Sequence, residues 1–259
     1  MSDVPIVFEE LPAKAGILGR VTLNVPATLN SLTLEMVDLL QEKLHQWRDD
    51  AKVAAVFIDG TGDKAFCAGG DVQALHRSAV ATPGGPCDYA ESFFTREYRM
   101  NYTLHTYPKP LICWGHGIDM GGGLGVMAGC SHRVETERTR IAMPDVTIAL
   151  YPAVVGSWYQ NHKPGKAGHL LALTGAAINA ADALSTGRAD RFIVSEHMAC
   201  VLALLLQQQW SVDSGVKHGL VMQVLRGFAA QRIGSCPGGQ VEPHLGSIAR
   251  LCDGDNVHE

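Results

Sequence analysis

The chain has 259 residues, a formal net charge of -5 and 46% hydrophobic residues, which is enough for one large domain with a real core. Lysine and arginine occur singly rather than in runs, so neither nucleic acid nor an anionic membrane is indicated, and we expect a small-molecule partner. The first residues carry acids without an apolar signal segment, and no later stretch approaches eighteen uninterrupted apolar residues. The expected location is therefore the cytoplasm, with no membrane contact.

The first third of the chain alternates strand and helix patterns. Residues 5–10 and 17–25 predict the two strands of a hairpin. Apolar residues at helical spacing then predict a helix over residues 34–47, with Thr33 as its N-cap. Residues 53–60, "VAAVFIDG", predict a buried strand that leads into the glycine-rich turn "TGDKAFCAGGDV" and a helix from about Gln73.

The same order then recurs. After an irregular insertion at residues 81–88, a long helix is predicted over residues 89–107, before two prolines. The stretch "LICWGHG" predicts a strand, and the glycines of "IDMGGGLGVMAGC" open a helix of small residues. Repetition of strand, strand and helix favours the coils of a single α/β spiral, and helical patterns dominate from Lys166 onward.

Two glycine-rich turns are the main candidates for a functional site. Residues 121–123 are three glycines at a predicted helix start, where backbone N–H groups have no intrahelical acceptor. Residues 68–71, "AGGD", form a second turn of this kind. Either turn alone is explained by tight packing, but two facing turns would direct N–H groups at one oxygen and stabilise a developing oxyanion.

Four motifs in this order resemble the crotonase (enoyl-CoA hydratase/isomerase) superfamily, and most closely its 3-hydroxyisobutyryl-CoA hydrolase branch. They are "AFCAGGDV", "HGIDMGGGLG", "AMPDVTIALYP" and "LTG....NAADAL". The resemblance covers about residues 5 to 195. It implies a ββα spiral core, an acyl-CoA thioester as substrate, a step of valine catabolism, and no metal or redox cofactor, since coenzyme A arrives with the substrate.

The resemblance also implies site residues. The backbone N–H groups of Gly70 and Gly122 would form the oxyanion hole, and Ala68 and Asp71 would lie along the path of coenzyme A. Substrate contacts are further expected at the neighbouring Gly69 and Gly121 and at Ala153.

The acids depart from the family pattern. Hydratases carry a glutamate at the position of Gly125, so addition of water by two carboxylates is disfavoured, whereas the hydrolase branch also has glycine there. That branch has a glutamate where this chain has Asp145 and an aspartate where it has Ala153, and Val155 adds bulk near the acyl pocket. Asp145 is therefore the catalytic candidate, one methylene short, although it could instead be an ordinary helix N-cap.

Other polar candidates receive a simpler interpretation. Asp119 precedes the glycine triplet, where a buried carboxylate could have a chemical role or could be a turn residue. His116 is expected to be a core histidine bonded to backbone, and Tyr151 a packing residue. Cys67 lacks a placed base, and the seven widely spaced cysteines, without a C-x-x-C pair, are expected to be reduced and mostly buried.

The sequence leaves three functions open. The first is an acyl-CoA hydrolase impaired by the missing acid; the second is a hydratase or isomerase acting through one carboxylate; the third is a silent acyl-CoA-binding subunit. The expected organisation is a spiral core over residues 1–195 and a helical region over residues 196–259, apparently shortened relative to the hydrolases. Apolar helices in that second region favour a homo-oligomer.

Overall fold

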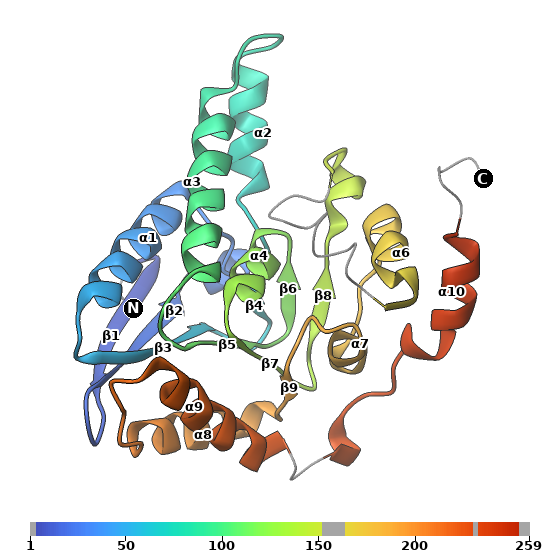
Figure 1. The fold of residues 1–259 in the computed structure, drawn as a ribbon. Coiled ribbons are helices and arrows are strands. Elements are labelled where there is room, and N and C mark those ends of the chain that lie inside the picture. Colours follow the sequence, from blue (N-terminus) through green and yellow to red (C-terminus); the bar gives the residue numbers. More distant parts are fainter. Residues whose placement is uncertain (1–3, 152–163, 230–232, 254–259) are drawn as a thin grey trace.

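The computed structural model describes residues 4–151, 164–229 and 233–253, and Figure 1 shows their arrangement. The strands are β1 (Ile6–Pro12), β2 (Ile17–Leu23), β3 (Val53–Gly60), β4 (Ala65–Cys67), β5 (Leu111–Gly115), β6 (Ile118–Met120), β7 (His132–Glu135), β8 (Arg140–Ala142) and β9 (Arg191–Phe192). The α-helices are α1 (Leu34–Asp49), α2 (Val72–Ala81), α3 (Asp88–His105), α4 (Gly122–Gly129), α6 (Ala167–Thr174), α7 (Ala180–Ser185), α8 (Met198–Leu206), α9 (Ser214–Ala229) and α10 (Leu245–Leu251).

Two sheets organise the fold. The larger has the order β1-β2-β3-β5-β7-β9 and is parallel except for the antiparallel hairpin of β1 and β2. The smaller has the order β4-β6-β8 and is parallel throughout. Strands that alternate between two sheets and return through helices confirm the predicted α/β spiral.

Alternating side chains of the large sheet build two layers of core. On β3, Val56 and Ile58 belong to a cluster with α1, α3 and α4, whereas Ala55 and Phe57 belong to a second cluster with α8 and α9. This alternation is the two-residue period of a strand buried on both faces. Because α8 and α9 complete the second cluster, the residues after 195 share a core with the sheet. Figure 1 shows these two helices below the sheet and the pair α2 and α3 projecting above it.

Local predictions of the first half are confirmed. The hairpin of β1 and β2 forms, and α1 begins after Thr33, whose side chain accepts a hydrogen bond from the backbone N–H of Met36. The glycine triplet opens α4 as expected. The strands of the small sheet, three residues each, were recognised less completely. The strand predicted over residues 111–117 corresponds to β5 of the large sheet, whereas β4 lies in the predicted glycine-rich turn and β6 in the stretch predicted to open a helix.

A buried carboxylate connects α7 to the chain that precedes α10. Asp182 is fully buried and accepts hydrogen bonds from the backbone N–H groups of residues 240, 241 and 242, at 2.8–3.1 Å. Clustered N–H donors of this kind satisfy a buried carboxylate. Within the described residues, no helix combines the length and apolar character needed to cross a lipid bilayer.

Candidate active site

Three segments that leave the small sheet meet at one cavity. Residues 68–70 follow β4, residues 121–122 follow β6, and residues 144–145 follow β8. Because the three strands are parallel neighbours, their carboxyl ends lie at the same edge of the sheet. A cavity of about 80 Å³ is lined by these segments and by side chains of α2, α3 and residues 148–150. The sequence-predicted residues Ala68, Gly69, Gly70, Gly121, Gly122 and Asp145 all line it.

The two glycine turns lie against each other. A Cβ atom built on Gly122 would stand 3.3 Å from the backbone nitrogen of Gly70, and one built on Gly69 would stand 3.5 Å from the nitrogen of Gly122. Gly69 has φ +107° and Gly121 has φ +48°, a region that side chains disfavour, so both turns depend on glycine. Gly122 is the first residue of α4, so its N–H group has no acceptor within the helix. The predicted pairing of N–H groups at one cavity is therefore geometrically available.

The cavity is also lined by a second carboxyl group, which was not predicted from the sequence. Glu97 of α3 is only 2% exposed, and its Oε1 lies where a Cβ on Gly122 would have to stand. A signal for it exists in the sequence. On α3, Phe93, Glu97, Met100 and Leu104 recur at helical spacing and are all buried, so Glu97 occupies an apolar stripe. A carboxyl group on the buried face of a helix favours a functional role.

Burial and a neighbouring acid set the proton affinity of Glu97. Removal from water raises the pKa of this carboxyl to about 7, and the charge of Asp145 contributes in the same direction. Asp145 is itself 8% exposed. A carboxyl group whose pKa lies near neutrality is suited to proton transfer near neutral pH, and Asp145 lines the same cavity.

The alternative role of Asp145 as a helix cap is not what the structure shows. Asp145 lies inside the short 3-10 helix Pro144–Ile148, whose N-cap is Met143, and that cap has no side-chain hydrogen bond. Asp145 instead lines the cavity. Asp71, expected along the coenzyme A path, is the N-cap of α2 and accepts a hydrogen bond from the N–H of Ala74 at 2.9 Å. Ala153 and Val155 lie outside the described residues.

Other sequence candidates have structural roles. Cys67 is fully buried, and burial raises its thiol pKa far above the ordinary value, so it is a packed residue. His116 is buried with Nε2 at 2.9 Å from the carbonyl of Gly62, as expected of a core histidine. Tyr151, expected to pack, is instead 72% exposed.

Of the seven free cysteines, three are buried, Cys67, Cys113 and Cys130, so "mostly buried" was too broad an expectation. Residues 4–151, 164–229 and 233–253 contain no cluster of three His, Cys, Asp or Glu side chains able to hold a metal ion.

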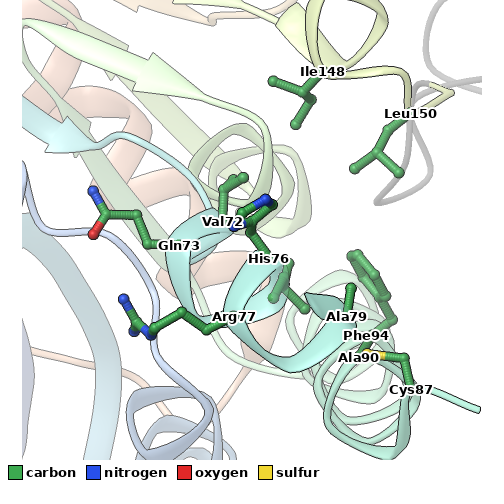
Figure 2. A pocket seen from close by; sticks show the side chains of 11 residues that line it. Val72, Gln73, His76, Arg77, Ala79, Cys87, Ala90, Phe94, Ile148 and Leu150 are labelled. Atoms are coloured by element: carbon green, nitrogen blue, oxygen red, sulfur yellow. The ribbon is translucent and has the colours of Figure 1, made fainter. Parts of the chain in front are cut away.

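A larger groove borders the cavity and shares lining residues with it. It has a volume of about 780 Å³ and lies between α2, α3 and residues 148–150. Figure 2 shows Ile148 and Leu150 opposite Val72 and His76 of α2, with Phe94 of α3 beside them. Most of these side chains are apolar, so the groove is suited to an aliphatic chain that extends from the cavity.

The fold and the site together define an α/β spiral of the crotonase type. Two solved structures superpose closely on the chain. A carnitinyl-CoA dehydratase from Mycobacterium thermoresistibile has a TM-score of 0.83 at 33% identity, over 98% of this chain and 68% of that protein. An enoyl-CoA hydratase from Rhodobacter sphaeroides 2.4.1 has a TM-score of 0.80 at 33% identity, over 97% of this chain and 67% of that protein. These matches confirm the predicted fold class.

Sequence comparison identifies the family. The family profile described as Enoyl-CoA hydratase/isomerase matches residues 18–259. A mitochondrial 3-hydroxyisobutyryl-CoA hydrolase from Homo sapiens is 33% identical over 97% of this chain and 63% of its own length. The protein of that name from Xenopus tropicalis is 41% identical over 86% of this chain and 57% of its own length. The chain belongs to the enoyl-CoA hydratase/isomerase family and spans about three fifths of the length of these two relatives.

Proposed function

We propose that this chain binds an acyl-CoA thioester and hydrolyses it, as the name of the 3-hydroxyisobutyryl-CoA hydrolase relatives suggests. The observation that carries the proposal is one cavity lined by both glycine turns and two carboxyl groups. The names of the solved neighbours also refer to CoA thioesters, which supports the same substrate class.

The proposed reaction assigns one task to each group. The thioester carbonyl oxygen accepts hydrogen bonds from the N–H groups of Gly70 and Gly122, which stabilise the negative charge of the tetrahedral intermediate. Asp145 takes a proton from the attacking water, whose oxygen bonds to the carbonyl carbon. Collapse of the intermediate breaks the C–S bond and releases coenzyme A, and Glu97 in its protonated form supplies the proton to the leaving sulfur. Every group in this scheme belongs to the chain, the substrate or water.

Hydration of an enoyl-CoA is a second candidate, and the structure favours it more than the sequence did. The chain has Gly125 where the two-carboxylate pattern of hydratases has a glutamate, but Glu97 on a different helix contributes a second carboxyl group to the cavity. Two carboxyl groups beside an oxyanion hole could add water across a double bond, with one acting as base and the other as acid.

A panel of acyl-CoA and enoyl-CoA thioesters followed by mass spectrometry distinguishes the candidates. Release of free coenzyme A from 3-hydroxyisobutyryl-CoA supports hydrolysis. Gain of one water with the thioester intact supports hydration, and binding without any change in mass supports a silent binding subunit. Absence of both binding and turnover over the whole panel contradicts the proposed substrate class.

We also propose that the protein self-associates. Among the described residues, Val212 and Leu251 are 98% and 84% exposed in the helical region that follows the spiral. Burial of such apolar side chains between copies would be favourable. Sedimentation at several protein concentrations tests this, and a monomer over the whole range contradicts it.

A further inference from the structure

Beneath the glycine turns lies a buried group that the proposed reaction does not use. Asp119 is the middle residue of β6, the central strand of the small sheet. Its neighbours in register are Cys67 of β4 and Ile141 of β8, each close to the point where a site segment leaves its strand. Asp119 is therefore at the centre of the element that positions all three segments of the cavity.

The carboxyl group of Asp119 points under the first turn of α4. A Cβ atom built on Gly123 would stand 2.7 Å from Asp119 Oδ1. Asp119 has no solvent exposure, and neither carboxyl oxygen has a hydrogen-bond partner among the described residues. An ionised carboxylate without hydrogen bonds in such a place is strongly disfavoured. The neutral acid is therefore the expected form.

A second buried carboxyl group acts electrostatically on Asp119. Glu135 of β7 is also fully buried, and its Oε2 accepts a hydrogen bond from Thr139 Oγ1 at 2.5 Å. The negative charge of Glu135 raises the pKa of Asp119, after burial, which is the larger cause. Burial raises the pKa of Glu135 to about 8, and the hydrogen bond from Thr139 favours its ionised form, so Glu135 is the first of the two to ionise as pH rises. Asp119 retains its proton to higher pH, because burial and then the charge of Glu135 raise its pKa.

The remaining groups around Asp119 shift its pKa in opposite directions. The charge of the buried Arg188 favours the ionised form of Asp119. The thiols of Cys67 on β4, Cys113 on β5 and Cys130 after α4 are also electrostatically coupled to Asp119, and burial keeps the first two neutral by raising their pKa. Asp119 and Glu135 are thus the pair whose proton responds to pH.

We propose that Asp119 is a positioning residue of the oxyanion hole, whose neutral form preserves the positive potential at Gly122 and whose ionised form weakens it. The proposal rests on the proposed oxyanion role of Gly70 and Gly122. A negative charge beneath the helix start that holds a developing oxyanion lowers the rate by about 10-fold to 10²-fold at the effective dielectric constant of a protein interior. Turnover should therefore decline at basic pH as Asp119 loses its proton.

The test is the pH dependence of kcat/KM for the substrate that the thioester panel identifies. In the wild type, kcat/KM should fall by about 10-fold or more at basic pH. Asp119→Asn keeps the shape of the side chain without the charge, so its kcat/KM at the same basic pH should be at least about 10-fold higher than that of the wild type. Glu135→Gln should move the decline to lower pH, because Asp119 then ionises more readily. Asp59→Asn is the matched control, because Asp59 is a buried carboxyl on β3 paired with Arg20. It should leave the profile unchanged.

If kcat/KM of a folded Asp119→Asn protein declines at basic pH as it does in the wild type, the proposal is overturned. A uniform loss of rate at every pH also overturns it, because that would indicate a structural role. If Asp119→Asn does not fold, Asp119→Thr provides the neutral variant.

A readout independent of turnover separates this proposal from the proposed function. The infrared difference spectrum of the wild type minus Asp119→Asn at neutral pH should contain a protonated-carboxyl band, because the bands of other protonated carboxyl groups such as Glu97 cancel; absence of this difference band overturns the proposal. Acetoacetyl-CoA, whose enolate an oxyanion hole stabilises, provides a second probe, with less enolate expected in Glu135→Gln than in the wild type. Failure of the wild type to bind this probe counts against the oxyanion hole itself, whereas binding with the same enolate fraction in both proteins counts against Asp119.

Discussion

Replacement of Gly122 by alanine tests the geometry of the cavity directly. The new Cβ would overlap Glu97 Oε1, and ordinary van der Waals contact begins only at 3.4 Å, so the carboxyl must move by more than about 1 Å. Gly122 does not have a positive φ, so alanine is compatible with its backbone. Displacement by 1 Å of a group that transfers a proton costs about 10² in rate, or about 2.7 kcal/mol of transition-state stabilisation.

The assay is kcat/KM for the best thioester of the panel, with thermal melts to verify folding. Gly227→Ala is the matched control, because a Cβ on Gly227, exposed on α9, meets nothing within 4 Å. Shortening the acid in the double variant Gly122→Ala with Glu97→Asp should relieve part of the overlap, so the two changes should not be additive. A folded Gly122→Ala protein with full activity would refute the assignment of Glu97 and Gly122 to one reacting site.

Three further outcomes are expected. The pKa of Glu97 is raised to about 7, so protonated Glu97 contributes fully to the free energy of unfolding below about pH 4.5, and this contribution is lost as pH rises through about 7. The free energy of unfolding should decline by on the order of 3 kcal/mol across that range. Thermal melts of Glu97→Gln should show no such decline. Asp145→Glu with Ala153→Asp should raise hydrolysis of 3-hydroxyisobutyryl-CoA by at least about 10², and no gain in a folded double variant would mean that the site is built for another reaction. Asp182→Ala should lower the free energy of unfolding by about 3 kcal/mol or more, because three backbone N–H groups lose their acceptor. Asp182→Asn, which keeps an acceptor oxygen, should lower it less. Denaturant titration that gives the same free energy of unfolding for the wild type and Asp182→Ala would contradict this account.

The sequence predicted those parts of the fold that depend on local patterns. The cap at Thr33, the opening hairpin and the glycines that begin α4 each follow from the conformational preferences of a few neighbouring residues. The short strands were harder, since the three residues of β4 or β6 beside a glycine-rich turn provide too little periodicity to indicate a strand.

The site was predicted in part for the same reason. Glycine turns are visible in the sequence because glycine is required where φ is positive, and their position before helices suggests N–H donors. Glu97 was missed because α3 also carries exposed acids and arginines, and only the packing of that helix shows which acid faces inward. Burial of Asp119 and Glu135 likewise depends on the packing of strands that are distant in the sequence.

The small sheet also has a consequence for the order of folding. Its strands are three residues long and are separated by about fifty residues between β4 and β6, so none is stable before the large sheet and α3 hold them in place. Pairing of β4, β6 and β8 should therefore belong to the late events of refolding, after the hairpin and α1 have formed. Ligand binding would then be recovered more slowly than helical circular dichroism, because the cavity exists only once these three short strands are in register.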